Sequence, residues 1–308
     1  MMTITHSPTD LRSASARFCL AIGFFDGVHL GHQQIIKQTI ADARQHEALA
    51  VVITFDRHPN TVVAPARVPP LIYSLPQKLR GIEATGAGAV ILLHFDEAFS
   101  RQSGEVFIRS LARDLGQIQS LCVGANFFFG HKRSGNVALL KTLGQEMHFT
   151  VHGLAAVSLD NQAVSSTRIR ETIARGGLDD AGQMLGRSYS IAGTVIRGDQ
   201  LGHQLGFPTA NLDITGLVLP QHGVYAVHAT TAGKRYRAVL NIGTRPTLND
   251  PKPQTRVEAH LLDFEGDLYD RELELTFLAK LRDEQKFASL ADLQSQISRD
   301  IQKALCLF

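Results

Sequence analysis

The sequence predicts two domains: a doubly wound α/β domain with a parallel sheet, then a small antiparallel β-barrel with a C-terminal helix. Three observations predict this fold class. The chain has 308 residues, more than one typical domain. Its first part alternates short apolar runs with helical patterns. From about residue 187, strand-like segments follow one another directly. We place the domains at residues 1–185 and 186–308.

The expected strands of the first domain are apolar throughout, which is typical of a parallel sheet covered on both faces. They lie at residues 18–23, 48–55, 89–95 and 120–124. Residues 31–45 and 103–116 carry apolar positions three and four apart, the spacing of amphipathic helices. The first two strands begin about thirty residues apart, the length of one βαβ unit. We expect the segment before residue 18 to be frayed.

The second domain shows alternating strand patterns separated by turn residues, which favours a small barrel or sandwich. These patterns cover residues 189–198, 223–231, 234–243, 255–264 and 273–281. One helix follows, capped by Ser289 with Asp292 three residues on. Its expected apolar face consists of Leu290, Leu293, Ile297, Ile301 and Leu305. Residues 174–188 are the expected boundary region.

Composition narrows the class of protein. The net charge is +2 with lysine and arginine scattered, which argues against a nucleic-acid-binding surface. The three cysteines are far apart in the sequence, and we expect them to be small buried hydrophobic residues of a protein in a reducing compartment. No apolar run is long enough to span a bilayer, and the N-terminus lacks the apolar region of a secretory signal. We therefore expect a cytoplasmic protein without a membrane partner, and the sequence leaves its oligomeric state open.

The stretch GFFDGVHLGH, residues 23–32, places His29 and His32 after an expected strand, where a helix begins. A helix N-terminus offers free N–H groups and partial positive charge, and Gly27 and Gly31 allow a ligand to approach the backbone. This favours a phosphate site. A zinc site would need further ligands that the nearby sequence does not supply. A metal site and two histidines of no special use remain the alternatives.

GFFDGVHLGH resembles the HxGH signature of the nucleotidyltransferase superfamily. VSSTRIRETI, residues 164–173, is similar to the SSTxIR signature that the same superfamily carries near the end of its domain. A simple helix cap is the alternative interpretation of these serines.

The C-terminal part resembles a flavokinase. GTVIRGDQLGHQLGFPTANL, residues 193–212, is similar to the glycine-rich loop and PTAN motif of that domain. NIGTRPT (241–247), VEAHLLDF (257–264) and LRDEQKFASLADLQSQISRD (281–300) resemble its later segments. Taken in order, the motifs make the chain similar to the prokaryotic bifunctional riboflavin kinase/FAD synthetase family.

For the second domain, the resemblance implies transfer of the ATP γ-phosphoryl group to riboflavin, which gives FMN. Glu258 would be the base that accepts the hydroxyl proton. Thr209 and Asn211 would bind Mg²⁺ and phosphate, because hard oxygens suit a hard cation. Gly198, Gly202 and Gly206 would let the loop wrap the phosphates, and Arg282 would contact the flavin.

For the first domain, the resemblance implies attack of the FMN phosphate on the α-phosphorus of ATP, which gives FAD and pyrophosphate. His29, His32 and Asn126 would be catalytic. The implied phosphate-binding residues are Gly23, Phe25, Asp26, Gly27, Gly31, Ser165, Ser166, Thr167 and Arg170.

Four positions depart from the family pattern. Ala163 and Phe128 stand where basic residues are common, Arg57 stands where proline is usual, and His203 replaces an expected arginine. A lost arginine–phosphate contact would weaken adenylyl transfer more than the kinase step. The alternatives are a kinase with a weakened or regulatory N-terminal half, a flavin-sensing protein without catalysis, and a cytidylyltransferase acting on a lipid head-group precursor.

Overall fold

The structure is a computed structural model, and it describes residues 2–13, 15–198, 202, 205–245 and 254–308. The chain divides into two compact units. One comprises Met1–Pro70 and Leu75–Ser166, and the other comprises Leu71–Ser74 and Thr167–Phe308. The domain boundary at residues 185 and 186 remains a prediction.

The first unit contains a parallel sheet, as predicted, and the sheet has six strands rather than the four expected. Its strand order is β1–β4–β3–β2–β5–β8. The strands are β1 (Thr3–Thr5), β2 (Arg17–Ile22), β3 (Leu49–Phe55), β4 (Ala89–Leu93), β5 (Gln117–Gly124) and β8 (Thr150–Leu154). The expectation of a frayed N-terminus is wrong, because Thr3 pairs in parallel with Ala89 and β1 extends the sheet edge.

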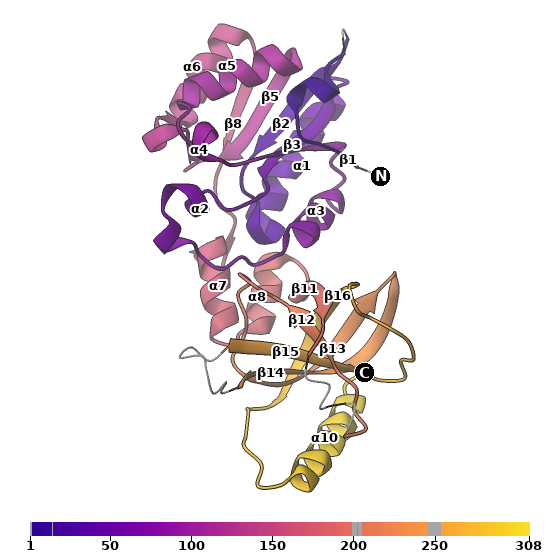
Figure 1. The fold of residues 1–308 in the computed structure, drawn as a ribbon. Coiled ribbons are helices and arrows are strands. Elements are labelled where there is room, and N and C mark those ends of the chain that lie inside the picture. Colours follow the sequence, from indigo (N-terminus) through magenta and orange to yellow (C-terminus); the bar gives the residue numbers. More distant parts are fainter. Residues whose placement is uncertain (1, 14, 199–201, 203–204, 246–253) are drawn as a thin grey trace. The chain divides into compact units, whose positions relative to one another are not determined.

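Helices cover both faces of this sheet, which confirms the doubly wound fold (Figure 1). Helices α1 (Leu30–Gln45) and α3 (Leu75–Glu83) pack on one face, and α5 (Gly104–Leu115) and α6 (Val137–Met147) pack on the other. Successive residues of β2 alternate between the two cores: Leu20 faces α5 and α6, and Ala21 faces α1 and α3. Shorter elements are η1 (Pro8–Leu11), η2 (Asp26–Val28), α2 (Asn60–Val63), η3 (Pro65–Arg67), α4 (Glu97–Ser100), β6 (Phe128–Phe129), η4 (His131–Arg133), β7 (Gly135–Asn136), β9 (Ser158–Leu159) and β10 (Gln162–Ala163).

The strand order reverses at β2. After β2 the chain adds β3 and then β4 on one side, and it crosses back to place β5 on the other. The carboxyl ends of β2 and β5 therefore flank the switch point of the sheet, where open α/β folds bind ligands.

The second unit contains a closed antiparallel barrel of order β11–β12–β15–β14–β13–β16, which confirms the predicted fold class. Its strands are β11 (Ser190–Ile196), β12 (Ala210–Asp213), β13 (Gly223–Thr231), β14 (Lys234–Arg245), β15 (Gln254–Leu261) and β16 (Glu272–Arg282). Helices α7 (Ser166–Ala174) and α8 (Leu178–Leu185) precede the barrel, and α10 (Leu290–Leu305) follows it. The sequence analysis missed β12, the four-residue strand of the PTAN motif.

Aromatic rings fill the barrel. Tyr189 stacks on Phe277 at 5.5 Å between ring centroids, and Tyr225 meets the same ring edge-on at 5.3 Å. Helix α10 covers part of the outer surface, where Ile301 and Ala304 join the core around Val224. Ser289 caps this helix as predicted, since its Oγ accepts from the Asp292 N–H at 3.1 Å. Leu290, expected on the apolar face, is 60% exposed.

Cys19 and Cys122 are buried, as predicted, whereas Cys306 is exposed, and all three are free thiols. Burial raises the pKa of the Cys122 thiol to about 12, so it stays protonated. Among the helices in the described part of the chain, none combines the length and apolarity that crossing a bilayer requires.

Candidate active sites

The first unit has a cavity of about 400 Å³ at the switch point of its sheet. Its walls come from the carboxyl ends of β2, β5 and β8, the start of α1, and the segment before α7. Eight of the predicted residues line it: Gly23, Phe25, His29, Gly31, His32, Asn126, Ser165 and Ser166. The fold thus brings HxGH and part of SSTxIR, far apart in sequence, to one cavity.

His29 is both the N-cap of α1 and a wall of this cavity. Its Nδ1 accepts a hydrogen bond from the His32 backbone N–H at 3.4 Å. A neutral His29 therefore carries its proton on Nε2, which makes Nε2 a donor. The two imidazoles stack with centroids 3.6 Å apart. Gly31 permits this arrangement, because a Cβ there would lie 3.2 Å from the His29 ring.

The turn between β2 and α1 holds three residues around Asp26 in unusual backbone conformations. Phe25 and Val28 have positive φ angles of 54° and 39°, and Gly27 has a φ of 77°. Such strain persists only where surrounding contacts enforce it, and it is common at functional sites. One of these contacts joins the two motifs, since the Ser166 hydroxyl donates to the Asp26 carbonyl at 3.2 Å.

The remaining predicted residues of this half are placed differently. Asp26 and Gly27 lie in the same turn, and the Asp26 side chain is buried. Thr167 and Arg170 lie on α7 in the part of the chain assigned to the second unit. Their approach to the phosphates stays a prediction.

In the barrel, Glu258 lies in a row of residues that face one another across neighbouring strands. It pairs in register with Asn211 of β12 on one side and with Asn241 of β14 on the other. The row continues through Val224 of β13 to Arg282 of β16. Paired residues project from the same face of a sheet. Because Val224 packs in the core beneath α10, the row faces outward under that helix.

A cavity of about 290 Å³ opens onto this row, with α10 and residues 284–287 as its other wall. It is lined by Gly202, Thr209, Asn241, Glu258, His260 and Arg282, with apolar groups from Phe207, Phe287, Leu293 and Ile297. An apolar cavity with a few convergent polar groups is the usual form of a small-molecule site.

Arg282, predicted to contact flavin, closes this cavity through a buried ion pair. Its Nε lies 2.9 Å, and a terminal nitrogen 2.8 Å, from Oδ2 of Asp300 on α10. The Asp300 carboxylate also accepts from Gln296 at 2.8 Å. The two side chains are 17% and 2% exposed. The pair therefore fastens α10 to β16 beside the cavity.

The glycine-rich loop approaches the PTAN strand closely. A Cβ at Gly198 would clash with the side-chain amide of Asn211, whose nitrogen is the nearest atom, and one at Gly202 would lie 3.0 Å from Thr209 Oγ1. Gly206, just before the motif, has a φ of 83°, which favours glycine. Thr209 and Asn211 are two apart along the chain and so share a face. Their oxygens, with Glu258 opposite Asn211, are a donor set that fits a hard divalent cation. His203 lies outside the described residues.

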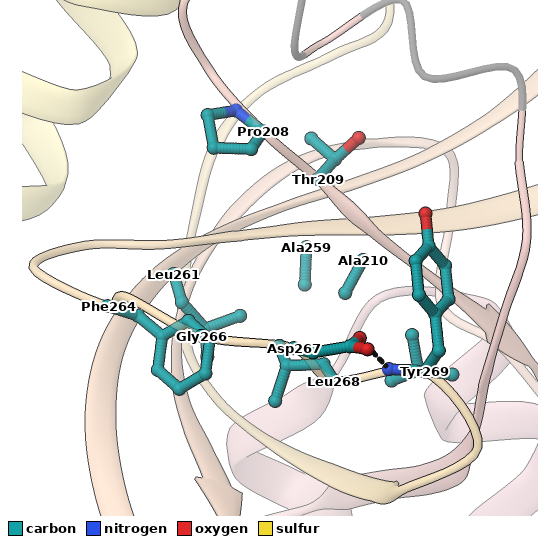
Figure 2. Close-up of a pocket in the computed structure, with 11 residues that line it drawn as sticks. Pro208, Thr209, Ala210, Ala259, Leu261, Phe264, Gly266, Asp267, Leu268 and Tyr269 are labelled. Atoms are coloured by element: carbon teal, nitrogen blue, oxygen red, sulfur yellow. Dashed lines mark hydrogen bonds between the residues drawn. The ribbon is translucent and has the colours of Figure 1, made fainter.

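A second pocket of about 160 Å³ also has Thr209 in its wall (Figure 2). Ala210 and Ala259 pair across β12 and β15 and form part of its wall. Phe264, Leu268 and Tyr269 come from the segment after β15, where Asp267 accepts a hydrogen bond from the Tyr269 N–H at 2.8 Å. Thr209 lines both this pocket and the cavity that contains Glu258.

Three further residues of this cavity, Asn241, His260 and Asp300, were not singled out by the sequence motifs. His260 Nδ1 lies 2.7 Å from the Pro208 carbonyl and its ring meets Phe207 edge-on, so it contacts the turn before Thr209. Asp300 had a usable signal: it interrupts an apolar face between Ile297 and Ile301. Among the described residues no three His, Cys, Asp or Glu side chains form a group that could hold a metal ion.

Comparisons with known proteins match both halves. A family model described as FAD synthetase matches residues 11–168, and one described as riboflavin kinase matches residues 185–308. The chain is 37% identical over 290 residues to a bifunctional riboflavin kinase/FMN adenylyltransferase of Haemophilus influenzae, with 94% of each chain covered. The enzyme of the same name from Pseudomonas fluorescens is 38% identical over 293 residues, with 94% and 93% covered.

One solved structure resembles the whole chain. It is a Streptococcus pneumoniae protein described as a macrolide-efflux protein, with a TM-score of 0.81, 26% identity, and coverage of 98% of this chain and 97% of that one. We take from it the similarity of fold. On the sequence matches and both family models, the chain belongs to the bifunctional riboflavin kinase/FMN adenylyltransferase family.

Proposed function

We propose that the chain makes FAD in two steps, each at one of the two cavities. The barrel phosphorylates riboflavin with ATP, and the α/β unit adenylylates the resulting FMN with a second ATP. One observation carries the proposal: in each unit, motif residues distant in sequence line a single cavity of the size of a small-molecule site. The family to which the chain belongs supports both activities.

In the kinase step, Glu258 accepts the proton of the terminal ribityl hydroxyl. The oxygen then attacks the γ-phosphorus of ATP, a new P–O bond forms, and the bond to the β-phosphate oxygen breaks to release ADP. Phosphoryl transfer depends on positioning and on stabilisation of charge more than on covalent catalysis. Glu258 pairs in register with Asn211, which supports a role for it as a base next to the phosphates.

Thr209 separates the two substrates. The cavity with Glu258 holds the flavin, because it combines the base with an apolar wall of sufficient size. The pocket in Figure 2, which shares Thr209 with that cavity, holds the nucleotide base between Tyr269, Leu268 and Phe264. The triphosphate then crosses Thr209 toward the base, under the glycine-rich loop.

Mg²⁺ would bind to the side-chain oxygens of Thr209 and Asn211, two residues that lie close to this loop. A bound Mg²⁺ supplies positive charge that offsets the charge of the phosphates. The side chains themselves orient the phosphates and hold the loop close to β12.

In the adenylylation step, an oxygen of the FMN phosphate attacks the α-phosphorus of ATP, and pyrophosphate leaves. FMN supplies the nucleophile, so the protein must bind two polyanions together and stabilise the charge between them. His29 donates from Nε2, and the N-terminus of α1 adds N–H groups and partial positive charge. Ser165, Ser166 and Asn126 line the same cavity and orient the substrates.

The test is product analysis by chromatography after incubation with ATP and Mg²⁺. Riboflavin should give FMN first and FAD later, and supplied FMN should give FAD. FMN without FAD from either substrate would reduce the α/β unit to a regulatory or vestigial part. Tight flavin binding without product would favour the sensing protein. The absence of both flavin binding and product would refute the proposal.

A further inference from the structure

Lys78 is a buried charged residue that none of the motifs includes. It lies on α3 and is 4% exposed. Its Nζ donates to the Phe55 carbonyl at the end of β3 at 2.7 Å, and to the Phe24 carbonyl after β2 at 3.4 Å. Burying an ammonium group costs free energy unless contacts inside the protein compensate for the lost hydration.

These contacts lead to the adenylylation cavity. Phe24 lines that cavity together with His29. Lys78 holds Phe24 twice, through its carbonyl and through the ring, whose centroid lies 4.3 Å from Nζ. Thr54, which is fully buried, donates to the same carbonyl at 2.9 Å. The start of the strained turn is thereby fixed to the end of β3 and to α3.

The charged ammonium group of Lys78 interacts with two carboxylate groups. Asp26 on the β2–α1 turn and Asp56 after β3 are the acidic groups that act on it. Asp56 already contacts His94, with 2.6 Å between Oδ2 and Nδ1, and accepts from the Phe95 N–H at 3.2 Å. Asp26 is 2% exposed, and its own carbonyl accepts from Ser166. The ammonium thus holds the acidic turn that joins the two nucleotidyltransferase motifs.

We propose that Lys78 is a positioning residue for adenylyl transfer: its charged ammonium group holds Phe24 and the turn through Asp26 in the conformation that presents His29 to the phosphates. The proposal rests on the adenylylation function proposed above. Lys78 acts through the turn and does not line the cavity.

Burial lowers the pKa of Lys78 to about 8, with Asp26 and Asp56 opposing the shift. The pH profile of the unmodified protein is therefore the first test. FAD formation from supplied FMN should be about tenfold slower at pH 9 than at pH 7, because about a tenth of Lys78 is then protonated. FMN formation from riboflavin by the same chain is the internal control, and its rate should show no such decline between pH 7 and pH 9.

The second test is Lys78→Met, which keeps an apolar stem and removes the charge, with Lys37→Met as a matched surface control. We expect kcat/KM for FAD formation to fall about 10–100-fold in Lys78→Met at pH 7, and its decline between pH 7 and 9 to disappear. The kinase rate of both variants should match the unmodified protein.

The outcomes separate the two proposals. If the unmodified protein forms FAD at pH 7 with no decline toward pH 9, the role of Lys78 is refuted and adenylylation stands. An active Lys78→Met variant with unchanged kinetics refutes it equally. If the unmodified protein forms no FAD at any pH, the adenylylation function fails, and the role of Lys78 fails with it.

Discussion

The buried charge of Lys78 should make the stability of the α/β unit depend on pH in a predictable direction. Its pKa falls from 10.5 in the unfolded chain to about 8 in the folded one, chiefly through burial. Between these values the unfolded chain binds more protons than the folded one, so the free energy of unfolding rises with pH. At 1.36 kcal/mol per pKa unit, the full effect of this residue is about 3 kcal/mol.

Below pH 8 the folded protein carries this whole penalty, and it is relieved as the pH approaches 10.5. Between pH 7 and pH 9.5 the gain amounts to about 2 kcal/mol. The measurement is urea unfolding of the unmodified protein and of Lys78→Met at both pH values. Circular dichroism is the suitable probe, since the chain has no tryptophan.

The quantity to compare is the difference between the two proteins at each pH. Burial raises the pKa of the Cys19 and Cys122 thiols, and their effect on stability at high pH has the opposite sign. Both proteins share it, so it cancels in the difference. A difference that stays constant between pH 7 and 9.5 would refute the lowered pKa. The expected result also bears on the rate of FAD synthesis. This rate should decline over the same pH range in which deprotonation of Lys78 makes the fold more stable. Unfolding would therefore not explain the decline.

Three further predictions concern the barrel. Glu258→Gln should slow FMN formation about 10²–10⁴-fold and leave FAD formation from supplied FMN unchanged, and equal loss of both rates would contradict the role of base. Asp300→Asn should lower the free energy of unfolding by about 3 kcal/mol, because Arg282 is left without its buried partner. The double variant Arg282→Met with Asp300→Leu replaces both charges with apolar groups and should lower this free energy far less. Calorimetric unfolding measures both variants, and equal losses would show that the ion pair itself stabilises the barrel. His260→Asn keeps a donor near the position of Nδ1 and should retain the KM for ATP, whereas His260→Gln should raise this KM about fivefold. Identical steady-state kinetics for the two variants would refute the contact with Pro208 as the role of His260.

The parts of the fold that the sequence predicts are those whose burial leaves a continuous pattern. β2 and β3 are buried almost throughout, and both appear as apolar runs. β1 and β8 lie at the two edges of the same sheet and are only partly buried, so no apolar run marks them. β12 is too short for its alternation to be recognised. Edge position and length, not weak pairing, explain these omissions.

The same limit applies to the sites. HxGH, SSTxIR and PTAN are local patterns, and each contributes residues that line one of the cavities. Asn241 and His260 acquire their significance from register and from contacts with β15 and Pro208, which come from distant parts of the chain. Positions in one sequence do not reveal which strands pair, so neither residue could be singled out.

Lys78 and Asp300 differ from both the motif residues and the residues placed by strand register. For each of them the sequence contains a recognisable pattern, a charged residue on an apolar helix face. Leu75, Lys78, Leu79 and Ile82 have the spacing of one helix face, and the three apolar members pack in the core beside α1. Asp300 occupies the corresponding kind of position among Ile297, Ile301 and Ala304 of α10. A charge on the apolar face of a helix must be compensated inside the protein.

How each charge is compensated decides what it can do. Asp300 meets an arginine with well-aligned hydrogen bonds, and the neutral pair acts as a fastening for α10. Lys78 is held mainly by carbonyl dipoles and keeps a net charge near the acidic turn, so burial shifts its pKa into a range where it can titrate. We therefore expect the barrel reaction to be insensitive to pH between 7 and 9, and the adenylylation reaction to respond, although one chain carries both.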